Sequence, residues 1–138
     1  MTPRAHLIDR YLDAIESSDH EALGAALHPA VQVILHPNLF APDGSTRQLT
    51  RLSSDFAAGQ GVLSVQRFGD RQYDELGPDQ VLARMVWTGE TAIELPGLPV
   101  GTSLKADVAS LVTFEGDWIV RQENWDCYYP AKLPSRED

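Results

Sequence analysis

The chain has 138 residues, a length that predicts one domain with its own hydrophobic core. Eleven lysine and arginine residues against twenty aspartate and glutamate residues give a formal net charge of −9. This charge disfavours binding to nucleic acid or to an anionic membrane surface, because both are themselves negative. A single cysteine, Cys127, excludes an internal disulfide and fits a reducing compartment. Since no apolar segment has membrane-spanning length, we expect a cytoplasmic protein.

Two helices are expected at the N-terminal end. A proline at the third position and apolar residues at helical spacing predict a first helix over residues 3–17. Ser18 and Glu21 have the spacing of a capping box, which predicts a short second helix. We expect Pro29 to stop that helix, because proline cannot continue the helical hydrogen bonding.

The rest of the chain is predicted to be mainly β-structure. A β-branched run forms a strand at 31–36, and apolar spacing between residues 49 and 56 predicts a third helix closed by Gly59. Four long strands follow, near 63–75, 80–94, 103–115 and 117–127. Helices first and strands after indicate an α+β domain, in which a conical, curved antiparallel sheet wraps around the helices. We expect this domain to cover residues 1–130 and residues 131–138 to form a short polar tail.

The last predicted strand carries the clearest sign of a binding cavity. Every second side chain between residues 118 and 126 lies on one face, which is apolar at Trp118 and polar at Asn124 and Asp126. A cavity wall with an apolar floor and a reactive mouth would show this gradient. The same pattern also fits a strand-end carboxylate that caps a turn or pairs with an arginine, so both interpretations of Asp126 stay open.

Three further polar residues stand out against their surroundings. Ser110 interrupts the apolar face of the strand at 103–115, and Tyr11 lies on the apolar face of the first helix. Both positions also fit ordinary core residues. His36 opposes the more apolar face of its strand, so the alternation alone places it outside. The histidines and the cysteine have no spacing typical of metal ligands or thiol catalysis, and we predict neither a metal nor a cofactor.

Several motifs are together more specific than each is alone. They are Arg10-Tyr11-Leu12, the strand end His36-Pro37, Trp87-Thr88-Gly89-Glu90, and Gly116-Asp117-Trp118 leading to Asn124-Trp125-Asp126-Cys127-Tyr128-Tyr129-Pro130. In their order and spacing they resemble the nuclear transport factor 2-like superfamily, and within it the SnoaL-like polyketide cyclases and ketosteroid isomerases. The resemblance extends to about residue 130. It implies a cystatin-like α+β barrel of three helices and a curved sheet around a deep hydrophobic cavity.

The resemblance also implies roles for individual residues. Tyr11 matches the tyrosine that donates to an oxyanion in the steroid isomerases, and Asp126 matches the last-strand aspartate that acts as a base in the cyclases. His36 and Ser110 fall where the isomerases hold acidic residues, which counts against literal steroid isomerisation. The candidate catalytic residues are thus Asp126, Tyr11 and His36, and the candidate substrate-binding residues are Asn124, Trp87, Ser110 and Asn38.

Residues and resemblance together favour a cofactor-independent cyclase or isomerase. Its substrate would be a small, hydrophobic, carbonyl-bearing metabolite, similar to a polyketide, steroid or terpenoid. Two alternatives stay open: a non-catalytic small-molecule binding protein, and an epoxide hydrolase or hydratase in which Asp126 activates water. The lack of an acidic residue two positions after Arg84 counts against the epoxide hydrolase. Trp125, on the outer face of the last strand, suggests a homodimer surface unless the C-terminal tail covers it.

Overall fold

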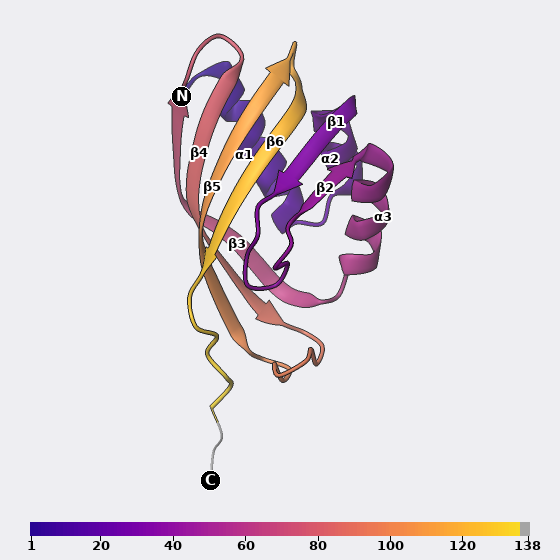
Figure 1. The fold of residues 1–138 in the computed structure, drawn as a ribbon, viewed down its shortest axis with the longest axis vertical. Helices are drawn as coiled ribbons and strands as arrows, with labels where there is room; N and C mark the ends of the chain where they lie inside the picture. Colours follow the sequence, from indigo (N-terminus) through magenta and orange to yellow (C-terminus); the bar gives the residue numbers. More distant parts are fainter. Residues whose placement is uncertain (136–138) are drawn as a thin grey trace.

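The polypeptide forms three helices and one curved sheet (Figure 1). Two helices precede the first strand, and the third helix lies between the second and third strands. The structure is a computed structural model that describes residues 1–135. The helices are α1 (Pro3–Glu16), α2 (His20–Ala26) and α3 (Leu49–Gly59). The strands are β1 (Leu27–Leu35), β2 (Ser45–Gln48), β3 (Leu63–Glu75), β4 (Gln80–Thr91), β5 (Ser103–Glu115) and β6 (Trp118–Tyr128).

The start of α2 differs from the capping box that the sequence predicts. Asp19, not Ser18, is the cap, and its carboxylate accepts a hydrogen bond of 3.1 Å from the backbone nitrogen of Ala22. Ser18 has a left-handed backbone with a φ of 56°, which turns the chain from α1 into α2. Pro29 does not end α2 either, because it lies inside β1. There the pairing with β6 skips residues, which suits a proline without an N–H group.

The sheet has the strand order β2-β1-β6-β5-β4-β3 and does not close into a barrel. All neighbours are antiparallel except β1 and β6, which are parallel. The predicted curved and mostly antiparallel sheet is therefore confirmed, with this one parallel pair that the sequence did not indicate. A parallel pair needs a long crossover, and the chain between β1 and β6 contains β2, α3, β3, β4 and β5.

The hydrophobic core lies between α1 and the concave face of the sheet (Figure 1). Ile8 and Leu12 of α1 are almost fully buried against Val81, Phe114 and Ile119 of the strands. This position of α1 follows from its apolar stripe, which must be covered by the apolar face of another element. None of the helices within residues 1–135 combines the length and the hydropathy needed to cross a membrane.

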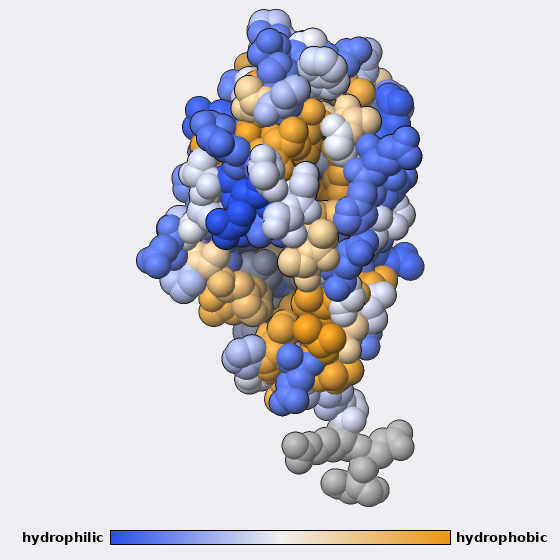
Figure 2. Space-filling model, turned by 90° about the vertical axis from the view of Figure 1, so that its right-hand side faces the viewer, coloured by the Kyte–Doolittle hydropathy of each residue, from blue (hydrophilic) through white to orange (hydrophobic). Residues whose placement is uncertain are grey.

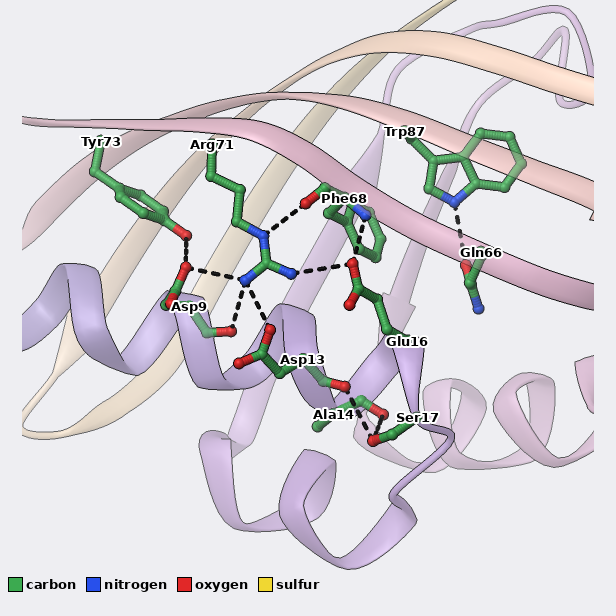
Figure 3. A network of polar contacts seen from close by, with 10 residues as sticks. All are labelled: Asp9, Asp13, Ala14, Glu16, Ser17, Gln66, Phe68, Arg71, Tyr73 and Trp87. Carbon is green, nitrogen blue, oxygen red and sulfur yellow. Dashed lines mark hydrogen bonds and ion pairs between the residues drawn. The ribbon is translucent and has the colours of Figure 1, made fainter.

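A set of ion pairs holds α1 against β3 (Figure 3). The guanidinium of Arg71 donates to the carboxylates of Asp9 at 2.9 Å, Asp13 at 2.8 Å and Glu16 at 3.1 Å. The hydroxyl of Tyr73 donates to Asp9 at 2.7 Å. We call these five residues the Arg71 network. Burial acts to raise the pKa of Asp9, but the hydrogen bonds from Tyr73 and Arg71 outweigh it, so the pKa of Asp9 lies below its usual value.

The C-terminal segment is partly attached to the sheet. Lys132 and Ser103 exchange backbone hydrogen bonds of 2.8 and 2.9 Å after β6 has ended. The predicted polar tail at 131–138 is therefore paired at Lys132, and its residues 136–138 lie outside the described residues.

Candidate active site

A cavity of about 230 Å³ lies between α1 and the concave face of the sheet. Most of its wall is apolar, formed by core side chains of α1, β1, β3, β4 and β5. Its polar lining residues come from α1, β5 and β6 and are Tyr11, Ser110, Gln122, Asn124, Asp126 and Tyr128. The polar groups therefore gather mainly along the last strand.

The register of the sheet explains why these groups lie together. Gln122, Asn124, Asp126 and Tyr128 are alternate residues of β6, so their side chains share one face. That strand pairs with β5, where Asn124 lies opposite Ser110. The period-two prediction is confirmed for this half of the strand.

The other half of the strand departs from the prediction. The pairing of β6 with β5 shifts at Phe114, which pairs with Ile119 after Thr113 has paired with Arg121. This bulge reverses the alternation, so Ile119 is buried and Trp118 is 50% exposed. The apolar floor that the sequence assigned to Trp118 is thus formed by other residues.

Asn124 is held in a fixed orientation by two neighbours. Its side-chain oxygen accepts hydrogen bonds from the hydroxyl of Ser110 at 2.6 Å and from the amide of Gln122 at 3.1 Å. The amide group of Asn124 is thereby left to donate into the cavity. The side-chain oxygen of Gln122 is buried and has no hydrogen-bond partner among residues 1–135.

The carboxylate of Asp126 is set apart by its lack of partners. Among the described residues no side chain forms an ion pair or hydrogen bond with it, which departs from both the turn-capping and the arginine-paired interpretation. Burial is the single cause that shifts its pKa, and it raises the value. A half-buried carboxylate without a cation beside it is a stronger proton acceptor than a solvated one.

Two tyrosines supply hydroxyl groups to the same cavity. Burial raises the pKa of Tyr11 to about 12. Burial, together with the charge of Asp126, raises the pKa of Tyr128 to about 12. Both hydroxyls therefore keep their protons at neutral pH and act as hydrogen-bond donors. Sequence reasoning missed Tyr128 as a site residue, although it is the next inward position after Asp126 in the same alternation.

His36 lies away from the cavity. Its ring stacks on Trp125 with centroids 4.5 Å apart, and its Nε2 is 2.9 Å from a carboxylate oxygen of Glu123. The hydrogen bond from His36 lowers the pKa of Glu123. The structure does not bring His36 together with Tyr11 and Asp126. His36 follows directly after β1 and is out of phase with Val33, which lines the cavity, so the two side chains lie on opposite faces of the sheet. A homodimer across the face that carries Trp125 stays a prediction.

Two of the candidate substrate-binding residues use their polar groups locally. The side-chain oxygen of Asn38 accepts from the backbone nitrogens of Phe40 and Ala41 at 3.0 and 3.2 Å, which stabilises a loop outside the cavity. Trp87 lines the cavity, but its indole nitrogen donates to Gln66 at 3.1 Å (Figure 3). It therefore contributes an apolar ring and no free donor. Within residues 1–135 no three acidic, histidine or cysteine side chains are placed to share a metal ion.

No protein-family model and no curated protein sequence matches the chain, whereas solved structures do. IdmH from Streptomyces antibioticus, described as a "putative polyketide cyclase", matches with a TM-score of 0.75 at 20% identity, over 91% of this chain and 92% of that chain. TerC, co-crystallised with polyporic acid, matches with a TM-score of 0.71 at 21% identity, over 91% and 92% of the two chains.

A third matching structure is described by its fold. A hypothetical protein with a ketosteroid isomerase-like fold from Catenulispora acidiphila, in complex with trimethylamine, matches with a TM-score of 0.70. The identity is 17%, over 91% of this chain and 86% of that chain. The chain has a ketosteroid isomerase-like fold. At the level of the fold, this confirms the resemblance to SnoaL-like and ketosteroid isomerase-like proteins.

Proposed function

We propose that the protein is a cofactor-independent cyclase or isomerase that moves a proton on a small carbonyl-bearing metabolite. The observation that carries this proposal is the carboxylate of Asp126, which has no ion-pair or hydrogen-bond partner among residues 1–135, inside a largely apolar cavity that also holds hydroxyl and amide donors. The fold that the chain shares with structures described as "putative polyketide cyclase" supports the proposal, although a fold alone does not determine an activity.

Asp126 acts as the general base. A carbon next to a carbonyl is a weak acid, and its proton is removed most readily by a base whose pKa lies closer to neutrality than that of a solvated carboxylate. Burial shifts the pKa of Asp126 in this direction. The apolar wall contributes further, because it keeps water from competing for the carboxylate.

The donors of the cavity stabilise the charge that forms. When Asp126 takes the proton, the electron pair of the broken C–H bond moves toward the carbonyl oxygen and makes an enolate. Tyr11, Tyr128 and the amide group of Asn124 are the donors available to that oxygen. Each well-placed donor contributes roughly 3 kcal/mol to such a transition state.

Two outcomes follow from the same enolate. In an isomerisation, the protonated Asp126 returns its proton to a different carbon and the double bond shifts. In a cyclisation, the enolate carbon forms a bond with a second carbonyl carbon, and the resulting alkoxide takes the proton from Asp126. Both sequences begin and end with Asp126 ionised, so neither needs a cofactor.

Exchange of hydrogen for deuterium beside a carbonyl tests the first step without knowledge of the natural substrate. Acetophenone and cyclohexanone are incubated with the protein in deuterated buffer, and α-deuteration is followed by NMR. We expect the wild type to accelerate exchange and Asp126→Asn to lose this acceleration. Asp117→Asn, in the exposed turn before β6, is the matched control and should keep it.

The same experiment separates the alternatives. Ketones that bind without any exchange would refute the proposal and favour a small-molecule binding protein. An exchange rate that survives in Asp126→Asn would refute the role of Asp126. No structural observation favours the epoxide hydrolase. Arg84 pairs with Asp74 outside the cavity, and both side chains are more than half exposed.

A further inference from the structure

The cavity beside Asp126 is small for the substrate class proposed above. Its volume of about 230 Å³ equals that of about eight water molecules, at roughly 30 Å³ each. Binding pockets for small molecules usually have about 300 to 1,000 Å³. The cavity thus accommodates a head group of about one ring, and any larger substrate must extend elsewhere.

A second hollow of about 350 Å³ adjoins this cavity. It lies between α1, α2, α3 and the start of β1, and we call it the helical compartment. Tyr11 and Ile15 line both spaces, so the two spaces meet at the side chains of these two α1 residues. The apolar residues around the helical compartment are Leu23, Leu27, Leu49, Leu52 and Phe56.

The polar side chains of the helical compartment are few, namely Tyr11, His20 and Ser53. His20 is its one titratable side chain apart from Tyr11, and the ring of His20 packs edge-on against Phe56 with centroids 4.4 Å apart. The side-chain amide of Gln60 also contacts the His20 ring. A ligand group in this compartment would therefore meet mainly hydrocarbon and no ionised carboxylate or lysine.

The cover of the compartment, α3, is the least buried of the helices. None of its residues is fully buried, and no side chain caps its first turn. Its three large apolar residues, Leu49, Leu52 and Phe56, all line the compartment. Figure 2 views the molecule from the side of α3, where the surface is hollowed near its middle and hydrophobic residues border the hollow.

We propose that the helical compartment is a binding subsite for an apolar tail of the molecule whose carbonyl head lies beside Asp126. The substrate is then an amphipathic ketone with a head of about one ring and a neutral tail that passes Tyr11 and Ile15. The position of the head rests on the proposed function. The tail subsite rests on the shared wall of the two spaces and on the apolar lining.

Calorimetric titration with a series of aryl ketones tests the subsite. The probes are acetophenone, butyrophenone, hexanophenone and octanophenone, which share one head and differ in the length of the tail. Burial of a methylene group increases affinity about fourfold, so the wild type should bind the longer ketones progressively more tightly.

Gly24, itself an exposed residue of α2, offers a position from which a larger side chain can extend into the compartment. It lines the compartment on α2, and a Cβ atom added there meets nothing within 4 Å. Gly24→Leu should abolish the gain with tail length and leave the affinity for acetophenone unchanged. Ala25→Leu adds the same side chain at the next position of α2, which is also exposed but does not line the compartment, and should behave as the wild type does. Leu52→Trp fills the compartment from α3 and provides a second, independent test.

Three results would overturn the subsite: no binding of any ketone, an affinity that does not rise with tail length, or a rise that survives in both filled variants. The proposed function fails separately. If affinity rises with tail length but the protein does not catalyse deuterium exchange, the proposed proton transfer by Asp126 is refuted and the proposed subsite is retained. If the protein catalyses exchange but affinity does not rise with tail length, the proposed subsite is refuted and the proposed proton transfer by Asp126 is retained.

Discussion

Replacement of Arg71 by alanine should release α1, and with it Tyr11, from its position against the sheet. The Arg71 side chain is 15% exposed and donates to the carboxylates of Asp9, Asp13 and Glu16 and to the backbone oxygens of Asp9 and Phe68. Its removal leaves three carboxylates close together without a cation. The alanine variant therefore loses attraction and gains repulsion at the same point.

The magnitude follows from the burial of the partners. Removal of one partner from a fully buried ion pair destabilises a protein by about 3 to 5 kcal/mol. The carboxylates here are 33%, 60% and 28% exposed for Asp9, Asp13 and Glu16, so water compensates for part of the loss. We expect Arg71→Ala to lower the free energy of unfolding by about 2 to 3 kcal/mol.

Urea unfolding followed by circular dichroism measures this loss. Arg84→Ala is the control, because Arg84 forms one ion pair with Asp74 and both side chains are more than half exposed. Its loss should cost about 0.5 kcal/mol. Arg71→Lys keeps the positive charge but lacks the planar guanidinium group that donates to several carboxylates at once, so it should recover part of the stability. Equal stabilities of Arg71→Ala and Arg84→Ala would refute the reasoning.

Three further predictions concern pH and packing. Because the folded pKa of Asp9 is depressed, the stability it contributes is complete above about pH 4 and is lost as the pH falls through the folded value. Acid titration of the unfolding free energy should show this loss in the wild type and much less of it in Arg71→Ala. The folded pKa of Asp126 is raised, so its ionisation destabilises the fold at high pH and has no effect below its unfolded value of about 3.9. Denaturation should therefore find Asp126→Asn more stable than the wild type at about pH 7 and equally stable at about pH 3. Gly89→Ala would place a Cβ 2.8 Å from the Trp87 ring and should cost about 1 to 3 kcal/mol, whereas Gly59→Ala, with no atom within 4 Å, should cost little.

Most elements of the fold could be predicted from the sequence because each has its own periodicity. The first and third helices and the four long strands lie close to their expected bounds. The strand β2 has the sequence Ser-Thr-Arg-Gln, which carries no apolar alternation, and it exists through its pairing with β1. The parallel pairing of β1 with β6 joins segments far apart in the chain, which no local pattern reports.

The candidate site shows where alternation succeeds and where it fails. It placed Ser110, Asn124 and Asp126 on one cavity wall, and it put His36 on the outer face, where the resemblance implied a catalytic position. It failed at Trp118, because a bulge in β6 is not visible in a single sequence. The helical compartment could not be predicted from the sequence either, since it depends on how three helices meet around Tyr11.

The pKa of Asp126 in the folded protein tests the account most directly. Carboxyl-carbon NMR follows its titration, and comparison with Asp126→Asn assigns the resonance. The account predicts a pKa above the value of about 3.9 that aspartate has in unstructured peptides, because the carboxylate is half-buried and has no ion-pair partner among residues 1–135. A pKa at or below that value would place Asp126 in solvent or beside a cation, and would contradict its role as the base of the cavity.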